Sequence, residues 1–232
     1  GKDWDGALAV APSGVGRDIV EWQRLRDGSG AFGDYAAFVK RHPDWPGLPY
    51  LRKEGEATLA EVEDPAQVIA WFQTEPPQSG AGAVALVRTY LAQGRAAEAE
   101  TEALRAWTTL PFSQGAEAAL LALMPEALAL GDELRLENAL WEGRAEEARR
   151  MLPRVSEDHR ALAEARLGLQ GEAKGVTALI EAVPDSRAGD AGLAHDRFIW
   201  RMKKDLYDEA LELILERSAS ADTLGRPEAW AE

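Results

Sequence analysis

Cysteine is absent from this sequence of 232 residues, and histidine is scarce. The lack of thiols excludes disulfide bonds, thiolate metal sites and cysteine nucleophiles. The three histidines, His42, His159 and His195, lie far apart and have no helical metal-binding spacing such as H-E-x-x-H. We therefore expect no metal site and no bound cofactor. No apolar run is long enough to cross a bilayer, so no membrane span is expected.

Positive charge is also in short supply, with 26 Lys and Arg residues against 40 Asp and Glu residues and a formal net charge of −14. Nucleic acids and anionic membranes need a basic surface that neutralises phosphates, so neither is an expected partner. Residues 1–5 (GKDWD) lack the basic segment and apolar core of a signal peptide. The chain is therefore either cytosolic or a mature form whose signal peptide has been removed.

Period-two alternation, which is typical of β-strands, is missing, and helical periodicity takes its place. The clearest case is residues 83–107, which predict two helices joined by a tight turn at Gly94. Glycine closes a helix in the left-handed conformation without a steric penalty. Trp107 closes the far end of the second helix. The predicted facing stripes are Val84, Val87, Tyr90 and Leu91 on the first helix, and Ala96, Ala99, Ala103 and Ala106 on the second.

The same pattern recurs at residues 140–148, 169–179 and 202–211. Ala99 and Ala148 are 49 positions apart (148 − 99), and Ala148 and Ala210 are 62 apart (210 − 148). A strict tetratricopeptide array keeps a period of about 34 residues. We therefore expect an all-α superhelix of stacked helical hairpins, with degenerate tetratricopeptide-like repeats, over residues 1–232.

Further helices follow from the same periodicity, roughly a dozen in all. Asp64-Pro65 is a strong helix start, because it offers an N-cap carboxylate and a proline at the first helical position. Ser156 is expected to cap the helix that begins there. The other predicted helices cover residues 4–10, 18–26, 34–41, 48–62, 114–124, 133–142, 144–152, 156–170, 176–183, 191–203 and 206–217.

Residues 28–33 (GSGAFG) match the dinucleotide fingerprint G-x-G-x-x-G. We reject a nucleotide site there, because the fingerprint needs a preceding strand and a βαβ unit, whereas a helix precedes it here. No serine lies in a G-x-S-x-G elbow. The carboxylates, such as Glu98, Glu100 and Glu102, fall at outward helical positions. No catalytic, cofactor-binding or metal-binding residue is therefore assigned.

Eight tryptophans are present, and Trp22, Trp71, Trp107, Trp141 and Trp200 lie on predicted helices. Exposed aromatic rings could stack on sugars. A tryptophan on an apolar stripe more often packs between helices, because it buries a large area. Interhelical packing is the interpretation that we favour.

A family resemblance is carried by residues 20–26 (VEWQRLR), 32–38 (FGDYAAF), 41–48 (RHPDWPGL) and 51–52 (LR), with residues 198–201 (FIWR) and 209–215 (EALELIL) in support. These stretches resemble the N-terminal superhelical region of bacterial soluble lytic murein transglycosylases. The resemblance implies a U- or ring-shaped helical domain, a periplasmic location after removal of the signal peptide, and peptidoglycan glycan strands as partner.

In that family a separate C-terminal lysozyme-like domain cleaves the glycan between N-acetylmuramic acid and N-acetylglucosamine and leaves 1,6-anhydro products. Its catalytic glutamate lies in a Glu-Ser motif, and this sequence contains no Glu-Ser pair. Leu123-Met124-Pro125 matches a fragment of a second family motif, but residues 119–122 before it depart from the pattern. No catalytic glutamate is carried over. The resemblance makes this chain the scaffold, inactive alone, and places the catalytic domain outside it.

A second interpretation is a stand-alone helical-repeat adaptor that binds a peptide or a protein. Such an adaptor would have a stoichiometric protein partner and no affinity for glycan. Both interpretations stay open at the level of the sequence.

Overall fold

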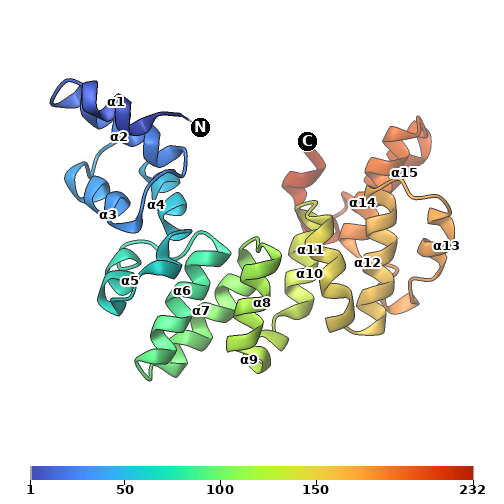
Figure 1. Cartoon of the computed structure of the whole chain (residues 1–232). Helices are drawn as coiled ribbons and strands as arrows, with labels where there is room; N and C mark the ends of the chain where they lie inside the picture. Colours follow the sequence, from blue (N-terminus) through green and yellow to red (C-terminus); the bar gives the residue numbers. More distant parts are fainter. Residues whose placement is uncertain (1, 232) are drawn as a thin grey trace. The chain divides into compact units, whose positions relative to one another are not determined.

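The computed structural model describes residues 2–231, and these residues form helices and their connections (Figure 1). Helix accounts for 72% of the chain, with sixteen α-helices and no β-strand within residues 2–231. The expected all-α class is confirmed. No helix in this part of the chain combines the length and apolar character that crossing a membrane requires. The chain divides into two compact units, Gly1–Leu128 and Ala129–Glu232.

The first unit contains most of its core between α2 and α6. Tyr35 has no exposed surface, and its hydroxyl donates a hydrogen bond to the carbonyl oxygen of Leu25 at 2.9 Å. Asp64 caps α5 as predicted, because its carboxylate accepts from the backbone N–H of Ala66 at 2.9 Å. The helices are α1 (Trp4–Val10), α2 (Val15–Arg26), α3 (Phe32–Arg41), α4 (Leu48–Glu56), α5 (Pro65–Trp71), α6 (Gly80–Ala92), α7 (Ala96–Thr109), α8 (Gln114–Leu123) and α9 (Pro125–Ala129).

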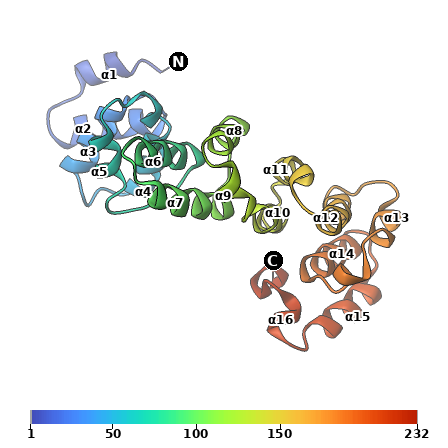
Figure 2. The ribbon, with the colours of Figure 1, turned by 90° about the horizontal axis from the view of Figure 1, so that it is seen from below.

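The second unit is arranged around α12, which packs against α10 on one side and α14 on the other. α10 pairs with α11, α12 with α13, and α14 with α15 (Figure 2). Leu162, Leu169 and Leu193 are central to its apolar core. The helices are α10 (Asp132–Trp141), α11 (Ala145–Met151), α12 (Glu157–Gln170), α13 (Val176–Glu181), α14 (Ala191–Lys203), α15 (Tyr207–Arg217) and α16 (Ala221–Leu224).

One backbone turn joins four of the helix pairs. In each case a residue with positive φ follows the first helix, at Gly94 (71°), Gly143 (66°), Glu172 (50°) and Asp205 (59°). The next residue donates its N–H to the carbonyl five positions back, at 2.8–3.0 Å. This pattern is the Schellman motif, which satisfies carbonyl groups at the end of a helix. The turn predicted at Gly94 is confirmed.

In three of these four pairs the second helix buries an alanine at the same distance from the turn. Ala99, Ala148 and Ala210 each lie five positions after the positive-φ residue, and none has exposed surface. The small side chain lets the second helix lie close against the first, as in α6 and α7 (Figure 1). The recurring pattern that the sequence shows at these alanines is therefore a packing pattern.

Several predicted details are wrong. The sequence predicts one helix over residues 48–62, whereas α4 ends at Glu56 and a short 3₁₀ turn follows at Leu59–Glu61. Thr58 stabilises the break, because its hydroxyl donates to the carbonyl oxygen of Gly55 at 2.7 Å. Ser156 lies at the N-cap of α12, but its hydroxyl contacts Glu133 and His159 and does not cap the helix.

The predicted faces of two helices also differ from the structure. The sequence predicts one apolar stripe on α6, but that helix also buries Gly82, Ala85 and Thr89, because α5, α7 and α8 all pack against it. Conversely, α8 is rich in alanine and leucine, but its buried residues are Glu117 and Leu120.

Candidate functional site

Four residues of the family resemblance, Trp22, Phe38, His42 and Trp45, gather into one aromatic cluster in the first unit. The ring centroids of Trp22 and Trp45 are 6.5 Å apart, and those of Phe38 and Trp45 are 5.5 Å apart. His42 lies 4.7 Å from Phe38 and 4.9 Å from Trp45, and its Nε2 is 3.3 Å from a carboxylate oxygen of Asp18. The cluster fixes the connection between α3 and α4 against α2. These residues therefore have a packing role in the structure.

The three histidines do not meet. His42 belongs to this aromatic cluster in the first unit. His159 lies at the start of α12, where its Nδ1 is 2.9 Å from a carboxylate oxygen of Glu133, and His195 lies on α14. Within residues 2–231, no group of three or more His, Asp or Glu side chains has a metal-binding arrangement.

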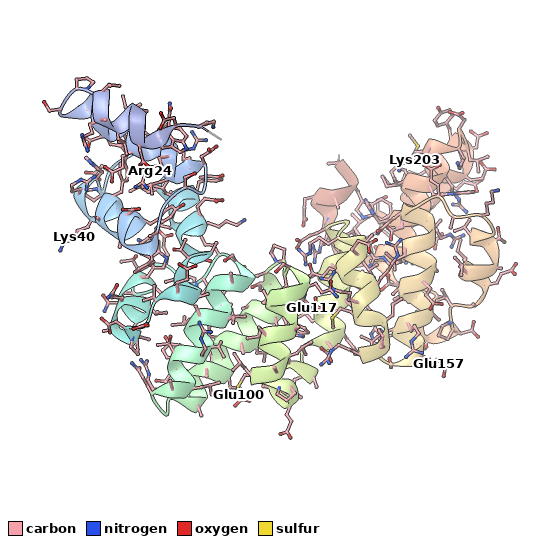
Figure 3. The ribbon with its side chains drawn as sticks, viewed as in Figure 1. Arg24, Lys40, Glu100, Glu117, Glu157 and Lys203 are labelled. Atoms are coloured by element: carbon pink, nitrogen blue, oxygen red, sulfur yellow. The ribbon has the colours of Figure 1, made fainter. Side chains whose placement is uncertain are left out.

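The GSGAFG stretch forms a helix connection. Gly28 has a φ of 73° and ends α2 with the turn described above, since Ser29 donates its N–H to the carbonyl of Arg24 at 3.1 Å. Arg24, labelled in Figure 3, binds across this turn to the carbonyl oxygen of Ser29 at 2.9 Å and to Asp34 at 3.1 Å. The connection has no strand before it, so a dinucleotide fingerprint is not present.

All eight tryptophans are buried or half-buried. Trp107 has no exposed surface and packs on Phe112, with ring centroids 5.8 Å apart. Trp71 is 6% exposed and stacks under the guanidinium of Arg52. The rings of Trp71 and Trp107 therefore have the buried environment that interhelical packing requires.

A hollow of about 330 Å³ opens between α3 and α5 in the first unit. Phe32, Val39 and Trp71 line it, together with Arg52. The Arg52 guanidinium donates to the hydroxyl of Thr74 at 3.2 Å and to the carbonyl oxygen of Trp71. The guanidinium of Arg52 therefore connects α4 to the end of α5, and its hydrogen-bond donors are in use there.

Glu56 is a deeply buried carboxylate of the first unit, and its pKa is shifted from the ordinary value. It is 1% exposed and accepts from the N–H of Gln78 at 2.8 Å and from the Ser79 hydroxyl at 2.5 Å. Burial raises the pKa of Glu56, and the two hydrogen bonds oppose that rise only in part. Ser79 caps α6, so Glu56 fixes the start of α6.

A buried polar network lies in the second unit, where α10, α12 and α14 meet. Arg166 on α12 has no exposed surface, and its Nε donates to Asp196 on α14 at 2.7 Å. Its Nη1 donates to both carboxylate oxygens of Glu137 on α10 at 3.2 Å. The guanidinium also lies 5.0 Å from the ring centroid of Trp141. One buried cation therefore ties three helices together.

Neighbouring groups complete this network. Gln170 donates from Nε2 to the carbonyl oxygen of Leu140 at 2.9 Å and to both oxygens of Asp196 at 3.1 Å. The indole N–H of Trp141 donates to Glu137 at 2.5 Å. Gly192 on α14 faces the guanidinium so closely that an added Cβ would overlap Arg166. Buried charges are stable only when paired and hydrogen-bonded in this way.

Aromatic rings extend the network to the surface. His195 lies 5.2 Å from Trp141 and 5.2 Å from Trp230, and Phe198 lies 5.4 Å from Trp230. We name the set formed by Glu137, Asn138, Trp141, His195 and Phe198 the α10–α14 face. The sequence predictions assigned no function to it. One signal was available, since Arg166 falls on the same helical stripe as Leu162 and Leu169, where an apolar residue is the rule.

The C-terminal segment, residues 224–231, lies on the α10–α14 face (Figures 1 and 2). Arg226 donates to the side-chain oxygen of Asn138, and its guanidinium lies 5.4 Å from the centroid of Trp141. The Nε2–H of His195 donates to the carbonyl oxygen of Ala229 at 3.0 Å. This segment, whose residues Pro227–Ala231 form a 3₁₀ helix, is thus held through a side-chain cation, an aromatic ring and a backbone carbonyl.

Comparisons with protein-family models, with curated proteins and with solved structures give no match for this chain. Function therefore has to be inferred from the residues and their geometry.

Proposed function

We propose that this chain is a non-catalytic scaffold, the superhelical part of a lytic murein transglycosylase in the periplasm. Its role would be to hold peptidoglycan glycan strands for a separate catalytic domain, which cleaves between N-acetylmuramic acid and N-acetylglucosamine. The observation that carries the proposal is that Trp22, Phe38, His42 and Trp45, which bear the resemblance, pack in one cluster. Residues that determine how helices stack are the ones that a shared architecture retains.

The spacing of the turns supports a repeat architecture. In the second unit, the positive-φ residues Gly143, Glu172 and Asp205 are 29 (172 − 143) and 33 (205 − 172) positions apart. These intervals approach the period of about 34 residues of tetratricopeptide repeats. The order in which α10, α12 and α14 pack, each with its own partner helix, also fits stacked hairpins.

The position of Glu56 supports the non-catalytic part of the proposal. Transglycosylase chemistry needs a glutamate whose raised pKa serves a reacting oxygen in a cleft. The pKa of Glu56 is raised, but its carboxylate is 1% exposed and already accepts from Gln78 and Ser79. A glycan oxygen could not approach it without unfolding the start of α6.

Two assays with the purified chain test this proposal. We expect the chain to co-sediment with purified peptidoglycan sacculi and to leave them intact in a zymogram. Clearing of the sacculi would contradict the non-catalytic role, and absence of co-sedimentation would contradict the glycan partner. The reading frame after Glu232 supplies a further check, because the proposal requires a domain with Glu-Ser and Gly-Leu-Met-Gln motifs.

The second candidate function is a protein-binding adaptor. It is favoured by one observation, the seating of residues 224–231 on the α10–α14 face. A face that holds a short, partly 3₁₀-helical segment in this chain has the chemistry to hold one from another chain. Under this candidate the chain binds a protein partner in stoichiometric amounts and does not bind sacculi.

A further inference from the structure

The C-terminal segment contacts the α10–α14 face as a bound peptide contacts a receptor. The ring of Trp230 contacts those of His195 and Phe198, with centroid distances of 5.2 and 5.4 Å. Four positions earlier, Arg226 places its guanidinium over Trp141. Between the two, the Ala229 carbonyl accepts from His195. Two side-chain anchors and one main-chain hydrogen bond are a typical means of recognising a short peptide.

The charge of the face suits a cationic ligand. Glu137 and Asp196 share the single guanidinium of Arg166, so this group of three carries a formal net charge of −1. Arg226 brings a positive charge beside them, where it can also interact with the electron-rich face of Trp141. The N-acetylated sugars of a glycan strand carry no such cation. The face is therefore better matched to a peptide that carries arginine.

The stretch that connects residues 224–231 to α15 is exposed, so the segment can leave the face easily. Residues 218–223 are exposed, and within the segment Gly225, Pro227 and Glu228 are exposed as well. α16 is only four residues long. A segment with so little buried surface is the part of a unit that opens at low free-energy cost.

Gly225 controls whether the segment can lie on the face. Its φ is 69°, and an added Cβ would lie 2.8 Å from the Cβ of Ala191 and 3.2 Å from Cζ2 of Trp141. Any other residue would therefore be strained in its backbone and would collide with the face itself. The seating of the segment depends on this one glycine.

We propose that the α10–α14 face is a binding site for a peptide segment of a partner protein that presents arginine and, four residues later, tryptophan, and that residues 224–231 occupy it in cis. This inference rests on the second candidate function. The chain's own segment then lowers the apparent affinity for the partner, because the face is free in only a fraction of molecules. Displacement of the segment raises that fraction.

The test uses the full chain and a fluorescent peptide that matches residues 220–231. Gly225→Ala displaces the segment and leaves every residue of the face unchanged, and we expect it to bind the peptide at least about tenfold more tightly than the unmodified chain. Gly189→Ala is the matched control, because nothing lies within 4 Å of a Cβ added there. A peptide with alanine at the positions of Arg226 and Trp230 is expected not to bind.

A second variant guards against misfolding. Arg226→Ala combined with Trp230→Ala removes both anchors from the segment and adds no bulk, so it also empties the face. If both variants keep their helical circular dichroism and bind the peptide no more tightly than the unmodified chain, the inference is overturned. Formation of a dimer by the unmodified chain through residues 224–231 would overturn the partner assignment, because the face would take the segment of a second copy. Sacculus binding is a separate measurement, so failure here is distinguishable from failure of the glycan scaffold.

Discussion

Glu56 is a carboxylic acid with almost no exposed surface, and its environment favours the protonated form. Its folded-state pKa lies above the ordinary value of 4.5, so the folded chain binds this proton more tightly than the unfolded chain does. The resulting stabilisation is full below pH 4.5 and is lost as the pH rises through the folded-state pKa.

Glu56→Gln should remove this pH dependence. The amide is uncharged at every pH, so we expect the free energy of unfolding of the variant to fall less than that of the unmodified chain between about pH 4 and pH 8. Urea denaturation at a series of pH values measures the difference. Glu61→Gln, at an exposed position on the same connection, is the control. Equal pH profiles for Glu56→Gln and the unmodified chain would contradict the raised pKa.

Gly192 is required by the buried guanidinium of Arg166. Gly192→Ala places a methyl group where Arg166 lies, and overpacking of this kind costs about 1–3 kcal/mol of stability. We expect the loss in chemical denaturation of the full chain, with Gly189→Ala unchanged as the control. A Gly192→Ala variant as stable as the control would mean that α14 can move away from α12 without loss.

Among the helices and turns, the Schellman turn after α12 contains a non-glycine residue, Glu172, in the left-handed conformation. This conformation is unfavourable for glutamate. A left-handed conformation costs a residue with a Cβ roughly 1–2 kcal/mol, and glycine avoids this cost. Glu172→Gly should therefore stabilise the chain by about 1 kcal/mol relative to Glu172→Gln. The glutamine control matters because both variants lose the surface ion pair with Lys204. Thermal unfolding measures the difference, and equal transition temperatures would contradict the backbone argument.

The same turn shows what the sequence could and could not reveal about the elements. Gly94 and Gly143 can be recognised as turn residues in the sequence, because glycine is the usual left-handed residue. Glu172 and Asp205 occupy the equivalent position without that mark. The sequence therefore predicts the positions of those turns only approximately. The backbone angles are needed to find the intervals of 29 and 33 residues between Gly143, Glu172 and Asp205.

The polar network around Arg166 could not be recognised in the sequence for a related reason. Arg166 and Asp196 are charged residues on helices, and such residues normally face solvent. Their burial depends on how α10, α12 and α14 pack, and periodicity within one helix does not report packing between helices. Arg226 and Asn138 are 88 positions apart, so no local pattern could connect them.

For the molecule as a whole, the two units contain separate apolar cores. Leu25, Tyr35 and Leu51 belong to the core of the first unit, whereas Leu162, Leu169 and Leu193 belong to that of the second. We expect a fragment of residues 131–232 to keep its helical circular dichroism and to unfold cooperatively on its own. A fragment without a cooperative transition would show that the second unit depends on the first for its stability.

The contact between Arg226 and Asn138 also bears on the order of folding. The turns between paired helices close short loops, whereas this contact closes a loop of 88 positions, and loop closure costs more entropy as the loop grows. Contacts between neighbouring helices should therefore form early, and the segment should dock only after α10 and α14 are in place. In a refolding experiment, the tryptophan fluorescence change that is lost in a Trp230→Phe variant would then follow the gain of helix as a later kinetic phase.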